Sequence, residues 1–332
     1  MATQGHIVLT HWVHQETLDL LSNYGPVLAN QSRESLAREE LQARLAEARA
    51  VMVFMPDCVD AAFLAQCPRL KIVAAALKGF DNIDVAACTG RNIWLSIVPD
   101  LLTIPTAELA IGLMISLGRN VLAGDRRIRH AAFQGWRPLL YGKGLYGSTV
   151  GILGLGAVGS AIARMLTPFG CTTLAYDVRN ISRKECTELQ VQPTSLGELY
   201  KQSDFLVVAL PLTDATLHFI DREALSQMQK SCYLINMGRG SCIDEEAVGA
   251  ALARERLAGY SADVFAFEDW IRPNRPQYIP KRLLSEREHT LFTPHLGSAV
   301  DSVRKAIALE AAANIIDVFE GKRPRGAINS LQ

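Results

Sequence analysis

Three polar residues in the second half of the chain have side chains suited to proton and hydride chemistry on an anion. Arg239 offers a planar fork of donors for an oxyanion, and His295 can accept a proton near neutral pH. Glu268 could bond to the other ring nitrogen of that histidine and orient it. Each residue follows an apolar run that predicts a strand, and ligands of open α/β sheets bind beyond the carboxyl ends of strands. We therefore expect the three side chains to converge on one catalytic site.

Each of these residues also has a simpler interpretation. A histidine that follows a Thr-Pro pair, as His295 does, is often a capping or buried structural residue. Arg239 stands between two glycines and could satisfy loop carbonyls, while Glu268 could pair with Arg272. The order of the three residues, behind the dinucleotide motif described next, favours the catalytic interpretation.

A glycine-rich turn lies between a predicted strand, Thr149–Leu153, and a predicted helix, Ser160–Phe169. Gly154 permits a tight turn, Gly156 lets backbone N–H groups approach a pyrophosphate, and Gly159 lets the helix pack close to the strand. Unpaired N–H groups and the positive end of the helix dipole favour phosphate charge there. A purely structural turn is the alternative. The turn residues assigned to the cofactor are Gly154, Leu155, Gly156, Ala157, Val158 and Gly159.

Asp177 directly follows the next predicted strand, Thr172–Tyr176. Its carboxylate would accept hydrogen bonds from the adenosine ribose hydroxyls and repel a 2′-phosphate, which predicts NAD rather than NADP. Arg179, two residues further on, could weaken that preference. A solvated loop carboxylate is the alternative interpretation of Asp177.

Composition limits the classes of protein to consider. With 332 residues, of which 49% are hydrophobic, the chain can form two domains with sizeable cores, which excludes wholesale disorder. Equal numbers of basic and acidic residues, 34 of each, argue against broad binding to nucleic acid or an anionic membrane. The seven cysteines are scattered and form no metal-ligand spacing, so we expect reduced thiols and no metal. Met1 to Gly5 carry no cationic leader, and we expect a cytoplasmic protein.

Short apolar runs rich in β-branched residues alternate with amphipathic stretches in two sets, which predicts two doubly wound α/β domains with parallel sheets. A helix at Thr103–Val121, with Pro105 near its start, is long enough to bridge them. Further predicted helices are Arg38–Arg49 and Ser302–Phe319, and Trp270–Pro280 is a predicted surface loop. The predicted strands are Ile7–Thr10, Val27–Ala29, Val51–Met55, Ile72–Ala76, Ile93–Val98, Thr149–Leu153, Thr172–Tyr176, Phe205–Leu210, Tyr233–Asn236, Gly259–Val264 and Thr290–Phe292.

Together these motifs resemble the D-2-hydroxyacid dehydrogenase family along nearly the whole chain. The resemblance implies a Rossmann NAD-binding domain, residues 101–294, inserted into a flavodoxin-like substrate domain, residues 1–100 plus 295–332. It also implies NAD as cofactor, with Pro211, Met237 and Asp263 contributing to its site, and a homodimer. The matching segments are Gly79–Asp84, Gly154–Gly159, Asn236–Glu245, Ala262–Phe265 and Thr293–Gly297.

Within the family, the sequence most resembles the members that oxidise phosphite to phosphate. In the expected site, Lys78 places a second cation beside Arg239 and suits a small, highly charged oxyanion, which the N–H of Gly79 also binds. A solvent-facing lysine on a turn is the alternative. The sequence departs from the pattern at Met237–Gly238 and at Asp177, where a glutamate is expected. The closer similarities lie in Phe54–Asp57, Leu77–Asn82, Val98–Thr103, Phe133–Trp136, Phe267–Trp270 and Pro294–Val300.

The same resemblance implies roles for four further residues. Met55 would pack over the substrate, and Trp136 and Tyr141 would line or close the mouth of the site. Ser298 would hydrogen-bond to the substrate or the histidine, with a helix N-cap as the alternative. The expected reaction converts phosphite, NAD and water to phosphate and NADH. The alternatives are a D-2-hydroxyacid dehydrogenase or 2-keto acid reductase, and an NADH-sensing protein that resembles a co-repressor.

Overall fold

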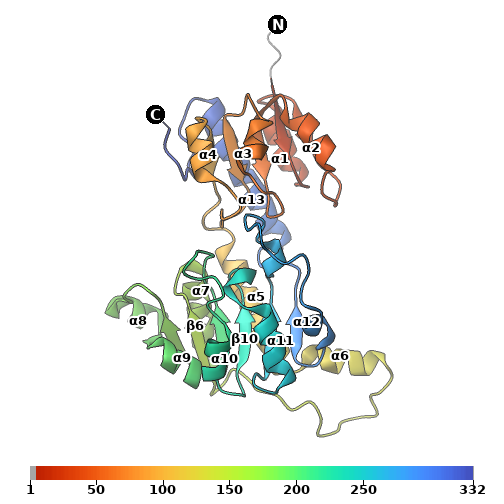
Figure 1. Ribbon diagram of the computed structural model, residues 1–332, viewed down its shortest axis with the longest axis vertical. Helices are drawn as coiled ribbons and strands as arrows, with labels where there is room; N and C mark the ends of the chain where they lie inside the picture. Colours follow the sequence, from red (N-terminus) through yellow and green to blue (C-terminus); the bar gives the residue numbers. More distant parts are fainter. Residues whose placement is uncertain (1–4, 332) are drawn as a thin grey trace. The chain divides into compact units, whose positions relative to one another are not determined.

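The computed structural model describes residues 5–331, and the chain divides into two compact units. The first unit runs to Leu102 and also contains Trp270–Pro273 and the chain from Ser298 onward; the second contains Thr103–Asp269 and Asn274–Gly297. Each unit is a parallel sheet covered by helices (Figure 1), so the predicted fold class is confirmed. The unit boundaries fall two or three residues after the predicted positions. The sequence prediction that Met1 to Gly5 carry no cationic leader falls mostly on residues 1–4, which lie outside the described residues.

The first unit has a five-stranded sheet in the order β2-β1-β3-β4-β5. Alternate residues of its strands face opposite sides. Ile7 and Leu9 therefore pack with Ile307 of the last helix, whereas Val8 packs with Leu45 and Leu64 on the other face. Both faces are buried, which explains why the strands are apolar without alternation. The elements are β1 His6–Leu9, α1 Gln15–Ser22, β2 Val27–Ala29, α2 Arg38–Leu45, β3 Ala48–Val53, α3 Ala61–Ala65, β4 Ile72–Ala75, α4 Val85–Gly90, β5 Trp94–Ser96 and α13 Asp301–Phe319.

The second unit has a seven-stranded parallel sheet in the order β12-β11-β10-β9-β6-β7-β8. Strand order reverses at β6, which pairs with β7 on one side and β9 on the other, and such a switch point is where α/β sheets bind ligands. The elements are α5 Thr103–Gly118, α6 Val121–Arg129, β6 Thr149–Leu153, α7 Ala157–Leu166, η1 Thr167–Phe169, β7 Thr172–Tyr176, α8 Arg183–Leu189, β8 Gln192–Pro193, α9 Leu196–Gln202, β9 Phe205–Val208, α10 Arg222–Gln227, β10 Tyr233–Asn236, η2 Gly240–Cys242, α11 Glu245–Ala253, β11 Gly259–Ala262, η3 Ala266–Glu268, α12 Lys281–Ser285 and β12 Thr290–Phe292.

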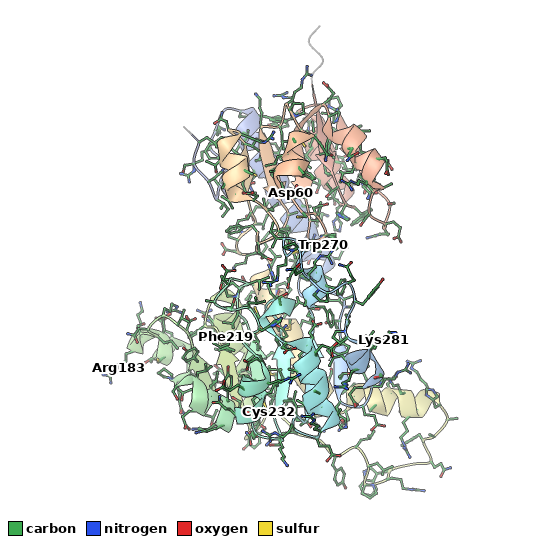
Figure 2. All side chains as sticks on the ribbon, viewed as in Figure 1. Asp60, Arg183, Phe219, Cys232, Trp270 and Lys281 are labelled. Atoms are coloured by element: carbon green, nitrogen blue, oxygen red, sulfur yellow. The ribbon has the colours of Figure 1, made fainter. Side chains whose placement is uncertain are left out.

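Two cores fill the space between the second sheet and its helices. Figure 2 labels Cys232 in the body of this unit, where its side chain is fully buried, and Arg183 on the outside at the start of α8. All seven cysteines are free. None of the described helices is by itself long and apolar enough to cross a membrane; α5 and α6 pass that test only as a pair bent by 61°.

The structure differs from the sequence-based expectation at several element ends. The predicted helix at 38–49 stops at Leu45, because Ala48 and Arg49 belong to β3. The helix predicted to reach Val121 stops at Gly118 and lies wholly in the second unit. The two-residue strand β8, which contains Pro193, has no apolar pattern and was missed.

Candidate active site

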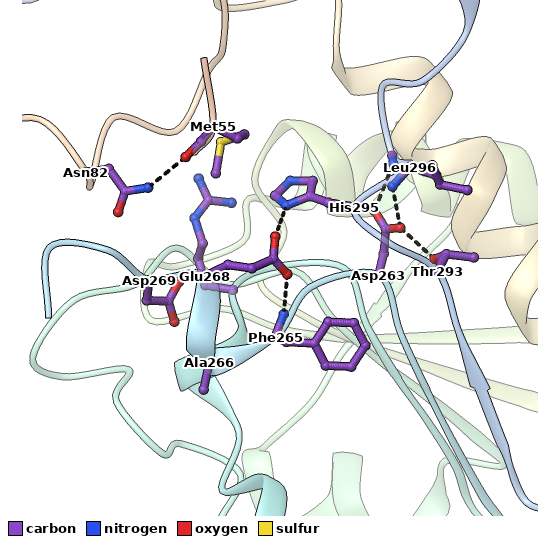
Figure 3. Close-up of polar contacts among 12 residues, drawn as sticks. Met55, Asn82, Asp263, Phe265, Ala266, Glu268, Asp269, Thr293, His295 and Leu296 are labelled. Carbon is purple, nitrogen blue, oxygen red and sulfur yellow. Dashed lines mark hydrogen bonds and ion pairs between the residues drawn. The ribbon is translucent and has the colours of Figure 1, made fainter. Parts of the chain in front are cut away.

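The three predicted catalytic residues follow three adjacent strands of the second sheet, at its carboxyl edge. Arg239 follows β10, Glu268 ends the short helix after β11, and His295 follows β12. The Nδ1 atom of His295 lies 2.8 Å from Oε2 of Glu268, and Figure 3 shows the two side chains pointing toward one another. Both remain partly accessible, with 25% of the His295 and 21% of the Glu268 side chain exposed. The bond occupies Nδ1 and leaves Nε2 as the ring atom that exchanges a proton with a reactant.

A second bond fixes the other carboxylate oxygen of Glu268. The backbone N–H of Phe265 donates to Oε1 at 2.9 Å. Phe265 thus holds Glu268, and Glu268 holds the imidazole. This is the arrangement of a base with an orienting carboxylate.

His295 itself has a left-handed backbone, with φ of 54°, a conformation that residues other than glycine adopt uncommonly. The neighbouring Asp263 holds it there. The N–H of His295 donates to the carbonyl of Asp263 at 2.9 Å, and the N–H groups of Leu296 and Gly297 donate to its carboxylate at 2.7 and 2.8 Å. The hydroxyl of Thr293 donates to the same carboxylate at 2.6 Å (Figure 3). Asp263, expected only at the cofactor, therefore also organises the histidine loop.

Replacing Asp263 by asparagine should disorder that loop. Burial is the main cause that raises the pKa of the Asp263 carboxyl, and its three hydrogen bonds oppose that rise. An amide NH₂ cannot accept a bond, so at least one buried donor is left unpaired. We expect a loss of about 2–3 kcal/mol in the free energy of unfolding and a large loss of turnover. Thermal denaturation measures the first, with Asp301→Asn on an exposed carboxylate as control; equal stability of the two variants would contradict the assignment.

The glycine turn has room for a dinucleotide. Gly154 has φ of +93°, and a Cβ on Gly159 would lie 2.0 Å from the carbonyl oxygen of Gly154, so both positions require glycine. A Cβ on Gly156 would meet no atom within 4 Å, which leaves open space at the start of α7. Among the described residues, no side chain caps that helix, so its first N–H groups are available to phosphate oxygens. The residues present fit the pyrophosphate of NAD.

Asp177 sits beside this turn and bonds to it. Its Oδ2 accepts the N–H of Leu155 at 2.7 Å, and its Oδ1 accepts the N–H of Arg179 at 3.1 Å. The guanidinium of Arg179 bonds to the carbonyl of Leu155 and pairs with Glu185 at 2.8 Å. That pairing is the main cause that lowers the pKa of Glu185, to about 2. A cation is thus held within 4.0 Å of Asp177.

Asp177→Asn should therefore increase the use of NADP. The amide keeps an oxygen for the N–H of Leu155 but removes the charge that repels a 2′-phosphate, while Arg179 remains nearby. We expect the ratio of kcat/KM for NADP to that for NAD to rise roughly tenfold or more. Steady-state kinetics with both cofactors measure the ratio, and Glu188→Gln, which removes an exposed charge from α8, is the control. An unchanged ratio would show that Asp177 does not discriminate.

The other expected cofactor residues also follow strands of this sheet. Pro211 is exposed three residues after β9, and Met237 follows β10 with 6% of its surface exposed.

Among residues 5–331, no three His, Cys, Asp or Glu side chains are grouped as metal ligands.

In the first unit, the expected substrate residues lie at the carboxyl edge of the five-stranded sheet. Lys78 and Gly79 follow β4, Met55 follows β3, and all three are half-buried. The side-chain amide of Asn82 donates to the carbonyl of Met55 at 3.3 Å, which joins the two loops (Figure 3). Ser298 is not the N-cap of α13, which begins at Asp301.

Sequence reasoning missed Arg304, which lies in the first turn of α13. Its Nη1 lies 3.4 Å from Oγ of Ser298, and its guanidinium lies 5.7 Å from the centroid of the Phe54 ring. Burial lowers the pKa of this guanidinium. Within the described part of the chain, no carboxylate pairs with it. A half-buried cation without an anion is unfavourable, which makes Arg304 a candidate anion ligand. Arg304 lies within a predicted helix, eight residues before Ala312, and nothing in the helical pattern marked it as a candidate site residue.

The structure does not bring Trp136 and Tyr141 to the catalytic residues within one chain. Both lie on the long loop after α6, and each is 77% exposed. That loop returns to the amino edge of the second sheet, where Lys143 pairs with Asp204 just before β9. Arg239, Glu268 and His295 lie at the opposite edge.

Glu245, the first residue of α11, is a second residue that sequence reasoning did not single out. It is 5% exposed, and burial is the main cause that raises its pKa to about 7, with Asp269, Glu268 and Glu246 adding repulsion. Between pH 4.5 and 7 the unfolded chain loses this proton while the folded chain keeps it. Stability should therefore fall as pH rises through that window and change no further above it.

Glu245→Gln removes this dependence because glutamine does not titrate. The Tm of the variant minus that of the wild type should rise from about pH 5 to about pH 7 and then level off. The full change corresponds to about 3 kcal/mol. Scanning calorimetry at several pH values measures it, and a constant difference would mean that Glu245 ionises normally.

Comparisons with known proteins identify the family of the chain. Residues 111–297 match the family model described as "D-isomer specific 2-hydroxyacid dehydrogenase, NAD binding domain", and that segment holds the glycine turn, Arg239, Glu268 and His295. The chain belongs to the D-isomer-specific 2-hydroxyacid dehydrogenase family. It is therefore an NAD-dependent oxidoreductase of that family, and NAD is its cofactor.

Relatives and solved structures extend the match over the whole chain. A glyoxylate reductase of Aeropyrum pernix is 35% identical over 328 residues, which cover 97% of this chain and 95% of that protein. The TT0316 protein of Thermus thermophilus has a TM-score of 0.87 at 29% identity, covering 98% and 100% of the two chains. A D-lactate dehydrogenase of Aquifex aeolicus, solved with NAD and lactic acid, has a TM-score of 0.82 at 25% identity, covering 95% and 96%.

Proposed function

We propose that this dehydrogenase oxidises phosphite to phosphate and reduces NAD. The observation that supports this substrate is the pair of cations at the carboxyl edge of the first unit's sheet. Lys78 stands in the loop after β4, and Arg304 is half-buried in α13 without a carboxylate partner among the described residues. Phosphite is a dianion near neutral pH, whereas a 2-keto acid such as glyoxylate carries one charge. Two cations in this one unit match the more highly charged substrate.

Each catalytic residue then has a defined task. Arg239 binds an oxygen of the oxyanion and stabilises the negative charge that develops on it. His295, oriented by Glu268, takes a proton from a water molecule through Nε2 as the water oxygen attacks phosphorus. The new P–O bond forms as the P–H bond breaks, and the hydrogen leaves with both electrons of that bond. NAD supplies the acceptor for this hydride, so phosphite, water and NAD give phosphate, NADH and a proton.

A second candidate function is reduction of a small 2-keto acid such as glyoxylate. The same His295–Glu268 pair would exchange the hydroxyl proton while hydride moves to or from carbon. Several relatives at 31–35% identity carry the name glyoxylate reductase, and they support this candidate more directly than they support phosphite oxidation. The two cations of the first unit are what favours phosphite.

Turnover with each substrate distinguishes the candidates. The purified protein is incubated with phosphite and NAD, and separately with glyoxylate and NADH, while the absorbance of the reduced cofactor is followed. We expect NADH to form with phosphite at a kcat/KM well above that for glyoxylate. Turnover of glyoxylate alone would establish the second candidate. Turnover of neither would favour an NADH-sensing binding protein.

We also propose that the protein is a homodimer joined through α6 and the loop after it. This segment extends away from the sheet of its own unit (Figure 1). It carries large exposed apolar side chains of a kind that interfaces bury. Replacing Phe133 by glutamate should produce monomers in sedimentation experiments, and a wild-type monomer would contradict the proposal. The exposed side chains are Ile128, Phe133, Trp136, Leu139, Leu140, Tyr141 and Tyr146.

A further inference from the structure

The loop that carries Arg239 and the loop that carries Glu268 are in direct contact. A Cβ on Gly240 would lie 1.8 Å from the carbonyl carbon of Phe265, so the two backbones touch at a position that tolerates only glycine. Arg239 is the residue before this contact, and Glu268 lies three residues after it. A small shift at the contact would move both side chains.

Two buried carboxylates, one from each side of this contact, accept hydrogen bonds from the opposite side. Asp269, on the Glu268 loop, accepts the N–H of Ser241 on the Arg239 loop at 2.8 Å. Glu245, at the start of the helix that follows the Arg239 loop, accepts the N–H of Ala266 on the Glu268 loop at 2.8 Å. Asp269 is 3% exposed and Glu245 is 5% exposed. Each loop thus supplies the acceptor for a backbone donor of the other.

The need to satisfy backbone hydrogen bonds does not by itself explain these two carboxylates. Oε2 of Glu245 is buried and has no hydrogen-bond partner among residues 5–331. Retaining a carboxylate there has a cost in stability, since burial raises its pKa to about 7. The hydrogen bond from the N–H of Ala266, at 2.8 Å, is what the side chain supplies in return. Costs of this kind are typical of residues that hold an active site in place.

We propose that Glu245 and Asp269 are positioning residues that form a reciprocal clamp and hold Arg239 and Glu268 in a fixed relation. Neither touches the reacting atoms in this scheme; they act through the backbone of the two loops. The inference rests on the proposed function only in that Arg239 and Glu268 serve the reaction. Because His295 depends on Glu268, loosening the clamp affects the base as well as the oxyanion ligand.

Graded substitutions test the clamp. Glu245→Ala and Asp269→Ala remove an acceptor completely, whereas Glu245→Gln and Asp269→Asn keep an amide oxygen. We expect the alanine variants to lower kcat tenfold or more and the amide variants to lower it about threefold, with KM for NAD within twofold of wild type. Glu246→Gln is the matched control, because Glu246 is the exposed neighbour in the same helical turn. It should leave kcat within twofold.

A merely structural role would give a different pattern. A structural role would lower the measured kcat only by lowering the fraction of folded protein. By contrast, Glu245→Gln should gain stability relative to the wild type as pH rises and still have a lower kcat. The clamp is overturned if the alanine variants keep kcat within twofold of wild type. If they fail to fold, the amide variants decide, and unchanged kcat in both overturns it.

A crystal structure of Glu245→Gln adds a readout that does not depend on the substrate. We expect its Glu268 Oε2 to His295 Nδ1 distance to lengthen beyond the 2.8 Å of the wild type. An unchanged distance together with unchanged kcat contradicts the clamp. If glyoxylate rather than phosphite is the substrate, the same variants are compared with glyoxylate, so failure of the proposed substrate and failure of the clamp are separate results.

Discussion

His295→Asn should lower kcat by roughly 10²–10⁴-fold, the contribution usual for a general base. The amide can still lie near Glu268, but it cannot take a proton from water. Affinity for NAD should stay within twofold, because the predicted cofactor residues, the glycine turn and Asp177, follow other strands. Rapid kinetics measure kcat, and quenching of tryptophan fluorescence measures NAD binding.

His289→Asn is the matched control for this variant. His289 is exposed and lies directly before β12, at the opposite end of the strand from His295. It should keep wild-type turnover. Retained turnover in His295→Asn would mean that another group is the base.

Lys78→Gln should separate the two candidate substrates. If Lys78 binds the substrate as proposed, removing its charge should lower kcat/KM for phosphite roughly 30-fold or more, and that for glyoxylate much less. The loss should lie mainly in KM, since the role proposed for Lys78 is substrate binding and not proton transfer. Steady-state kinetics with both substrates measure the two effects.

Lys71→Gln is the control for Lys78, because Lys71 is an exposed lysine directly before β4, at the amino end of the same strand. Its removal should leave both substrates unaffected. Equal losses for phosphite and glyoxylate in Lys78→Gln would remove the basis for choosing phosphite.

The elements that carry the candidate catalytic residues were predictable because their signals are local. The runs Thr149–Leu153, Thr172–Tyr176, Tyr233–Asn236 and Thr290–Phe292 are apolar, bounded by polar or glycine residues, and match β6, β7, β10 and β12. Because the carboxyl ends of parallel strands lie at one edge of a sheet, residues that directly follow these strands lie at that edge. The contact between Glu268 and His295 follows from that rule and from their residue types.

Residues that act through the backbone left no comparable signal. Glu245 looks like an ordinary acidic residue in the first turn of a helix, and nothing local shows that Ala266 lies against it. Arg304 is an arginine within an amphipathic pattern, and its guanidinium lies near the ring of Phe54, which is distant in the chain. Trp136 and Tyr141 were assigned by resemblance alone, and the fold of one chain places them at the other edge of the sheet. Contacts that join distant segments require the structure.

The most direct test of phosphite oxidation is to follow the hydrogen itself. Phosphite with deuterium on phosphorus is incubated with NAD and the wild-type protein, and the products are analysed by ³¹P NMR and by mass spectrometry of the reduced cofactor. The account predicts phosphate and an equal amount of reduced cofactor carrying one deuterium. Phosphite recovered intact, with its deuterium and no reduced cofactor, would contradict it.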